Sequence, residues 1–273
     1  MDRNNPSQRN FYSPLRKIKT GWVYAKAIWK EVKNKKTYFK CYKNNLSGII
    51  ELEDGLKIEI EGRRSLQFLN SIMFNKMYGM PRQQEIIVDI GANKGLFAIF
   101  FANQLRGKDL KIYCFEPHPN TYRILQNNVQ LNNLGSNISI SQKVVSAERV
   151  ANKSFFIARD SFDYSVFNEY ESEENIIVEN ITLPSIIDEN KIDKIDLLKM
   201  NCEGSEYEIL MNIPDSYLRK ISEIRMEFHN FELDGRIFNI EPLRAFLKEK
   251  KFVEVNYLPY TSDHGIIWFK NQK

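Results

Sequence analysis

Residues 86–95 read Ile86-Ile87-Val88-Asp89-Ile90-Gly91-Ala92-Asn93-Lys94-Gly95 and lead directly into the apolar run Leu96–Leu105. The apolar residues before the glycines are typical of a buried strand, and the run after them is typical of a helix. Glycines at such a turn let the backbone approach a ligand where Cβ atoms would clash, with helix N–H groups facing that ligand. The stretch therefore predicts a ligand-binding turn, although a tight turn in any Rossmann-like domain has the same pattern.

A second signal follows in Cys114-Phe115-Glu116-Pro117, where Glu116 stands at the end of the next apolar run. An acidic residue about 20 positions beyond the glycine turn binds ribose hydroxyls in doubly wound folds. The turn itself lacks the GxGxxG spacing that holds a dinucleotide pyrophosphate. The glycine turn and Glu116 together therefore favour a nucleoside cofactor without phosphates over NAD.

Strands and helices alternate from residue 85 onward, which predicts a mostly parallel sheet with helices on both faces. No helix joins the last two strands, so one of them should run antiparallel. A large excursion at about 148–184 interrupts the alternation, and we interpret it as an insertion on the substrate side. The predicted strands are 86–90, 111–115, 138–145, 195–200, 221–228, 252–257 and 265–269, and the predicted helices are 96–105, 120–131, 205–211 and 241–248.

The residues before this core differ from it in charge. Residues 1–43 hold 12 Lys and Arg against 2 acidic residues, whereas the remainder carries a net charge of −6. We expect a basic amphipathic arm at 1–45, a β-hairpin around Asp54-Gly55 with a helix at 64–77 within the segment 46–84, and the main domain at 85–273. The apolar stripe of the arm would pack on the body, form a dimer interface or lie on an anionic membrane. Its residues are Ile18, Trp22, Ala25, Trp29 and Val32.

The composition is that of a folded protein, with 42% hydrophobic and 27% charged residues, 12 Gly and 9 Pro. This excludes a disordered or collagen-like chain. No apolar run is long enough to span a membrane, and the N-terminus lacks a secretory signal. The three cysteines have no CxxC spacing and are expected to be reduced. We therefore expect a cytoplasmic protein, with peripheral contact at the inner face of a membrane as an alternative.

Four motifs, in order and with compatible spacing over about residues 86–270, resemble the FkbM family of S-adenosylmethionine-dependent methyltransferases. The resemblance implies a class I methyltransferase fold, with a mostly parallel seven-stranded sheet, S-adenosyl-L-methionine as cofactor, and O-methylation of a hydroxyl on a sugar, glycan or secondary metabolite. The motifs are Asp89 to Gly95, Phe115-Glu116-Pro117, Asn127-Asn128 to Asn132-Asn133-Leu134, and Leu197 to Glu206.

The resemblance also implies which residues hold the cofactor. Residues 91–95, including Gly91, Ala92, Asn93 and Gly95, would lie under its methionine part, and Asp89 would face its amino end. Glu116 would bind the ribose, and Val144 with Val145 would border the adenine. The family's Lys-Ile-Asp-Val-Glu-Gly motif has Asn201 here in place of the aspartate. Asn201 can form hydrogen bonds that position a ligand but cannot act as a base.

The candidates for catalysis stand at the ends of later strands. Alternation places Glu227 and His229 on the same side of their strand, at the sheet edge where ligands bind. Methyl transfer to a neutral hydroxyl needs a proton acceptor, so we predict His229 as general base, with Glu227 and Glu203 as further catalytic candidates. Glu203 and Glu206 also suit the N-terminus of a helix. These four residues lack a diagnostic metal spacing, and no metal is predicted. His264 is expected in a turn and His118 at a helix start.

Two alternatives remain open from the sequence. The basic arm with its interleaved Trp and Tyr residues suits an RNA methyltransferase, but no Asn/Asp-Pro-Pro-Tyr-type motif follows the fourth strand, so nucleic acid is the less favoured acceptor. The replacement of the family aspartate by Asn201 suits a catalytically inactive, methyltransferase-like binding protein. Measurement of cofactor affinity separates this last alternative from an enzyme.

Overall fold

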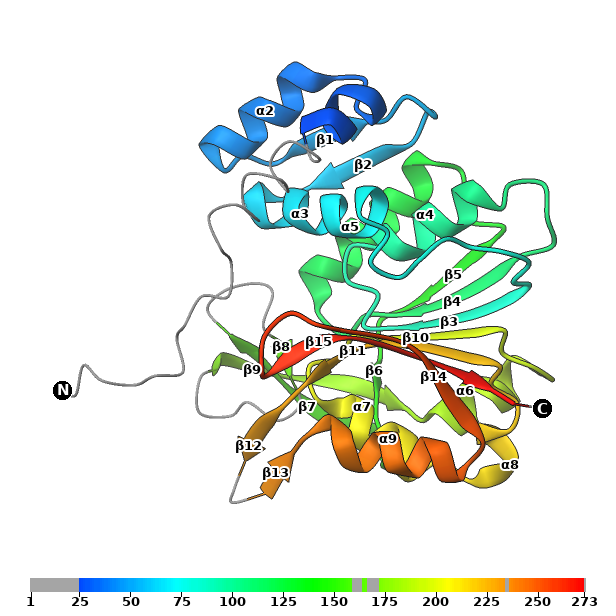
Figure 1. The fold of residues 1–273 in the computed structure, drawn as a ribbon. Coiled ribbons are helices and arrows are strands. Elements are labelled where there is room, and N and C mark those ends of the chain that lie inside the picture. The colour runs from blue at the N-terminus through cyan, green and yellow to red at the C-terminus, as the bar shows by residue number, and fades with distance from the viewer. Residues whose placement is uncertain (1–24, 159–163, 166–171, 234–235, 273) are drawn as a thin grey trace. The chain divides into compact units, whose positions relative to one another are not determined.

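Residues 25–158, 164–165, 172–233 and 236–272 are described by the computed structural model, in which the chain divides into two units, residues 1–70 and 71–273 (Figure 1). The described part of the chain has no helix that is both long and apolar enough to cross a membrane.

The first unit contains the predicted hairpin. Strands β1 (Gly48–Glu51) and β2 (Lys57–Ile60) pair antiparallel around the turn that holds Asp54-Gly55. Helix α2 (Lys35–Asn44) precedes the hairpin and α3 (Gly62–Leu69) follows it. The helix expected at 64–77 is therefore shorter, because α3 passes into a π-helical turn, η2 (Asn70–Phe74).

The arm of the first unit departs from the predicted stripe. Residues 25–31 are helical, and the buried side chains there are Ile28 and Val32. Trp29, which was expected on the buried stripe, is 66% exposed. Ile18 and Trp22 lie outside the described residues. The buried side of this helix therefore differs from the predicted stripe at Trp29.

The second unit is built on the predicted seven-stranded sheet, in the order β14-β15-β11-β10-β3-β4-β5. β11, β10, β3, β4 and β5 run parallel, whereas β15 is antiparallel to both of its neighbours, as the missing helix between the last two strands predicts. The strands are β3 (Ile86–Ile90), β4 (Lys111–Phe115), β5 (Ile138–Ser141), β10 (Leu197–Met200), β11 (Glu223–His229), β14 (Phe252–Pro259) and β15 (His264–Asn271).

Helices cover both faces of this sheet, and Figure 1 shows α4 and α5 on one side and α6, α7 and α9 on the other. The second face buries a continuous apolar core that includes Val88, Leu198 and Met226. The fold is thus the class I methyltransferase architecture that the sequence predicts. The helices are α4 (Leu96–Gln104), α5 (Pro119–Leu131), α6 (Leu183–Glu189), α7 (Ser205–Met211), α8 (Asp215–Leu218) and α9 (Ile240–Glu249).

The strand expected at 138–145 is divided between two sheets. β5 ends at Ser141, and β6 (Val144–Val145) pairs with β9 (Ser172–Ile181) of the excursion instead. The excursion therefore forms a small sheet in the order β6-β9-β7-β8, with β7 (Asn152–Ala158) and β8 (Tyr164–Ser165). A further hairpin, β12 (Phe231–Leu233) with β13 (Arg236–Phe238), follows β11.

Candidate active site

The glycine turn after β3 brings three strand ends together. The N–H groups of Gly91 and Ala92 both donate to the Phe115 carbonyl at the end of β4, each at 3.0 Å. Gly91 has φ +71°, and a Cβ there would stand 1.8 Å from the backbone oxygen of Asn201, just after β10. Only glycine fits this position, because backbone atoms block a side chain and the conformation is left-handed.

The far end of the turn is equally restricted. Gly95 has φ +80° and precedes α4, and a Cβ there would lie 2.4 Å from Leu125 Cδ1. Asn93 also has a positive φ of 50°. Gly91, Asn93 and Gly95 thus have left-handed backbone conformations in the loop that follows β3, at the carboxyl end of the sheet, where folds of this class bind ligands.

Glu116 follows β4 and faces this loop. Its Oε2 accepts a hydrogen bond from the Asn93 N–H at 2.8 Å, and its Oε1 accepts one from the His118 N–H at 3.0 Å. Burial raises the pKa of Glu116 to about 7, although the two backbone hydrogen bonds oppose that rise. The structure therefore places the predicted ribose acceptor against the glycine turn.

Asp89 and Lys199 form a buried ion pair behind the turn. Lys199 Nζ lies 2.9 Å from Asp89 Oδ1 and donates to the Gly91 carbonyl at 2.7 Å, and both side chains are almost fully buried. Burial raises the pKa of Asp89, and Lys199 opposes this rise. Asp89 was expected to face the amino end of the cofactor, but here its carboxylate is paired with Lys199, a partner that sequence reasoning missed.

Asn201 stands where β10 ends. Its N–H donates to the Ile90 carbonyl at 3.0 Å, which ties β10 to β3. Its side-chain Oδ1 is buried and has no hydrogen-bond partner among the described residues. Such an atom is costly to bury unless a ligand donates to it. The predicted role of Asn201 in positioning a ligand would depend on this Oδ1.

Val144 and Val145 form β6, which begins three residues after β5 ends. Val144 packs with Phe155 and Val178 of the excursion sheet, and Val145 belongs to the main core. Both side chains are at most 4% exposed. Both valines therefore contribute to apolar packing, and their place beside the adenine stays a prediction.

The catalytic candidates meet at the end of β11. His229 Nε2 lies 3.3 Å from Glu203 Oε2, and His229 Nδ1 lies 3.9 Å from Glu206 Oε1. Glu206 is fully buried and accepts the N–H groups of Cys202 and Gly204 at 2.8 and 2.7 Å, so it closes the loop before α7. The predicted helix-terminal role of Glu206 therefore agrees with its contacts, whereas Glu203 contacts the imidazole.

Glu227 and His264 complete the cluster. The antiparallel register pairs His264 of β15 with His229, and their rings stack with centroids 6.4 Å apart. Burial and the neighbouring His229 lower the pKa of His264. Burial raises the pKa of Glu227, opposed by His229 and Lys199. The sequence predicted a turn role for His264, and only the pairing of β15 with β11 brings it to the site.

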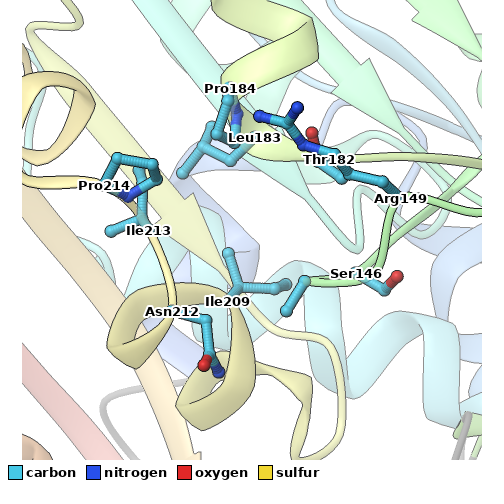
Figure 2. Close-up of a pocket in the computed structure, with 10 residues that line it drawn as sticks. Ser146, Arg149, Thr182, Leu183, Pro184, Ile209, Asn212, Ile213 and Pro214 are labelled. Carbon is cyan, nitrogen blue, oxygen red and sulfur yellow. The ribbon is translucent and has the colours of Figure 1, made fainter.

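A separate small hollow of about 90 Å³ lies between the start of α6 and the end of α7 (Figure 2). None of the predicted site residues lines it. Within the described ranges, no group of three or more His, Cys, Asp and Glu side chains is arranged to hold a metal ion. The hollow is lined by Ser146, Ala147, Arg149, Thr182, Leu183, Pro184, Ile209, Asn212, Ile213 and Pro214.

Comparison with known proteins identifies the family. Residues 89–254 match the methyltransferase FkbM domain, which is more than half of the chain. The chain therefore belongs to the FkbM methyltransferase family, and its domain is of the S-adenosylmethionine-dependent type.

Two curated relatives are similar at low identity. The AMB antimetabolite synthetase AmbE of Pseudomonas aeruginosa is 25% identical over 179 residues, which are 53% of this chain and 8% of AmbE. The methyltransferase sdnD of Sordaria araneosa is 26% identical over 196 residues, which are 61% of this chain and 73% of sdnD. The chain thus spans a small part of AmbE and most of sdnD.

Among solved structures, the complex of aTrm5 and tRNALeu is similar with a TM-score of 0.45 and 16% identity, covering 84% of this chain and 54% of that one. A likeness at this level carries no information about the acceptor.

The residues present fit S-adenosylmethionine. Glu116 offers a carboxylate to ribose hydroxyls, Asn201 offers an orphaned Oδ1 to a donor, and the loop from Gly91 to Gly95 keeps its backbone clear of side chains. S-adenosylmethionine has no pyrophosphate, so these contacts need neither the glycine spacing of a dinucleotide site nor a second acidic residue.

Proposed function

We propose that this chain transfers a methyl group from S-adenosylmethionine to a hydroxyl of a glycan, a lipid-linked sugar or a secondary metabolite. The observation that carries the proposal is the imidazole of His229 beside Glu203 at the end of β11, on the sheet edge that also holds the glycine turn and Glu116. Parallel sheets of this class bind their ligands along that edge.

The cofactor, when bound, supplies an electrophilic methyl group on a sulfonium. Glu116 would bind its ribose, and Asn201 with the loop from Gly91 to Gly95 would hold its methionine part. The contribution of the chain to the transfer is then alignment of the acceptor hydroxyl and removal of its proton.

His229 suits proton removal at Nε2. Its Nδ1 is buried, so the acceptor reaches the ring from the Nε2 side. Glu206, held by two backbone N–H groups, lies 3.9 Å from Nδ1 and would stabilise the imidazolium that forms. Glu203, 3.3 Å from Nε2, would orient the acceptor hydroxyl or share its proton. This arrangement resembles the base and orienting carboxylate of other proton-transfer sites.

The described surface of the first unit supports a proposed partner besides the acceptor. On α2, Lys36, Lys40 and Lys43 recur at spacings of four and three residues, Phe39 stands beside Lys40, and all four are exposed. Such a basic helix face with an aromatic residue suits an anionic membrane surface, where a lipid-linked acceptor would be found. Dimerisation through residues 1–43 is the competing proposal for the same segment.

The test is a panel of acceptors incubated with labelled S-adenosylmethionine and the full chain, followed by product mass. We expect one added methyl group on a hydroxyl-bearing glycan, lipid-linked sugar or polyketide-like compound. Methyl transfer to an RNA transcript alone would replace the proposal with the RNA alternative. Absence of cofactor binding by calorimetry would instead indicate an inactive binding protein.

A further inference from the structure

Tyr78 lies outside the segment that matches the family, in the connection between η2 and β3, yet its side chain is 2% exposed. Its ring packs edge-on against Phe97 of α4, with centroids 5.4 Å apart. The ammonium of Lys199 lies 5.5 Å from the centre of the Tyr78 ring. Tyr78 therefore covers the same buried lysine that donates to the Gly91 carbonyl.

The position of Tyr78 is held by groups on the sheet. The Arg225 guanidinium of β11 donates to the Tyr78 carbonyl and stacks 4.7 Å from the Trp268 ring. Gly79 follows with φ +72°, and a Cβ there would stand 2.7 Å from Trp268 Cη2. Strand register aligns Trp268, Arg225 and Lys199 in one row, so these side chains share a face of the sheet.

The hydroxyl of Tyr78 is the part that this packing leaves unexplained. It is buried and has no hydrogen-bond partner among the described residues. Burial and then the nearby Glu227 and Asp89 carboxylates raise the pKa of Tyr78. The hydroxyl therefore stays protonated at neutral pH, and it can both donate and accept a hydrogen bond. A buried, rigidly held and unpaired hydroxyl is a candidate for ligand contact.

We propose that the Tyr78 hydroxyl binds the amino-acid end of S-adenosylmethionine, an assignment that rests on the proposed use of that cofactor. Tyr78 contacts Lys199, and Lys199 donates a hydrogen bond to the carbonyl of Gly91, at the start of the glycine turn. The proposed ribose acceptor Glu116 instead accepts a hydrogen bond from the N–H of Asn93, farther along the same turn. An ammonium can donate to the phenol oxygen and a carboxylate can accept from it. A tyrosine at this place thus distinguishes the two ends of the cofactor.

The test compares full-length wild type with Tyr78→Phe, which keeps the ring and removes only the hydroxyl. Calorimetry measures the binding of S-adenosylhomocysteine and of 5′-methylthioadenosine, which lacks the amino-acid end. We expect Tyr78→Phe to weaken S-adenosylhomocysteine about tenfold to a hundredfold, as for a hydrogen bond to a charged group, and to leave methylthioadenosine unchanged. Tyr217→Phe is the matched control, because that hydroxyl already donates to Asp188 at 2.6 Å.

Several results would overturn the proposal. An equal loss for both ligands would indicate a structural role, and a lower unfolding temperature of cofactor-free Tyr78→Phe would point the same way. Unchanged S-adenosylhomocysteine affinity with a raised KM for the acceptor would assign the hydroxyl to the acceptor instead. Wild type that binds neither ligand would contradict the proposed function itself, which separates that failure from a failure of the Tyr78 assignment alone.

Discussion

Glu116 has a buried carboxylate, which accepts hydrogen bonds from the backbone N–H groups of Asn93 and His118. Burial raises its pKa from 4.5 to about 7, so the folded chain binds this proton more tightly than the unfolded chain does. The resulting stabilisation is complete below pH 4.5 and is lost as the pH rises through about 7. Ribose hydroxyls that donate to the ionised group would replace the missing water.

We therefore expect the affinity for S-adenosylhomocysteine to increase with pH through about 7 in the wild type, because the ionised carboxylate would accept hydrogen bonds from both ribose hydroxyls. Glu116→Gln should weaken binding at pH 8 by about 1.5 to 3 kcal/mol and flatten this pH dependence. Calorimetry at several pH values measures both effects. Glu208→Gln, at a half-buried position of α7, is the control. Equal affinities for wild type and Glu116→Gln would refute the ribose assignment.

His229 is the residue on which the proposed chemistry depends. Replacement by Ala should lower turnover by roughly 10² to 10⁴, while the affinity for S-adenosylhomocysteine stays nearly unchanged. Steady-state rates with a saturating acceptor give the first quantity and calorimetry gives the second. His264→Ala is the comparison, because the His264 ring stacks on the His229 ring while its Nδ1 lies 2.8 Å from Thr261 Oγ1.

If turnover survives in His229→Ala, proton removal belongs to Glu203, to Glu227 or to water. Burial raises the pKa of Glu227, and a raised pKa makes its carboxylate a stronger proton acceptor. A larger loss of turnover in His264→Ala than in His229→Ala would indicate that His264, on the neighbouring strand β15, is the general base.

At the scale of elements, the turn after β3 joins β3, β4 and β10 through backbone contacts. Gly91→Ala should destabilise the second unit by about 2 to 5 kcal/mol, because the new Cβ meets the Asn201 carbonyl at 1.8 Å and the backbone is left-handed. Chemical unfolding measures the loss.

Gly107→Ala is the matched control for that measurement. Gly107 has a similar φ of +80°, but a Cβ there meets nothing within 4 Å. Gly107→Ala should lower the free energy of unfolding by only about 1 to 2 kcal/mol, which is the cost of a left-handed conformation for a residue with a Cβ. Similar losses in the two variants would show that the contact with Asn201 is relieved by small shifts of the chain.

At the scale of the whole molecule, charge is concentrated at one end of the chain. We expect reversal of Lys36, Lys40 and Lys43 to Glu to reduce sedimentation with anionic liposomes at low salt at least tenfold, since each Lys near an acidic bilayer contributes about 1 kcal/mol. Reversal of the exposed Lys191, Lys248 and Lys270 of the second unit is the control.

Cofactor affinity should be equal in both triple variants, because neither set includes a residue of the glycine turn or Glu116. Wild-type chain that ignores such liposomes would eliminate the membrane proposal. Light scattering on the same samples then tests the dimer proposal, in which the α2 reversal lowers the measured mass.

The local sequence pattern alone determined the strand, turn and helix at residues 86–104. Strand, glycine turn and helix at 86–104 follow from an apolar run, two glycines and a second apolar run, and these depend on residues close in sequence. The antiparallel last strand follows equally from the missing helix before it. The glycine turn and Glu116 were likewise predictable, because strand ends of a parallel sheet meet at one edge.

Only the tertiary structure decided which side chains surround that turn. Lys199 meets Asp89, and Tyr78 covers Lys199, because β10 pairs with β3 over a separation of more than 100 residues. Strand order of this kind is absent from the local pattern, and so are the pairing of His264 with His229 and the transfer of Val144 to a second sheet. Burial and charge pairing are set by neighbours in space, and those neighbours exist only once the sheet has formed.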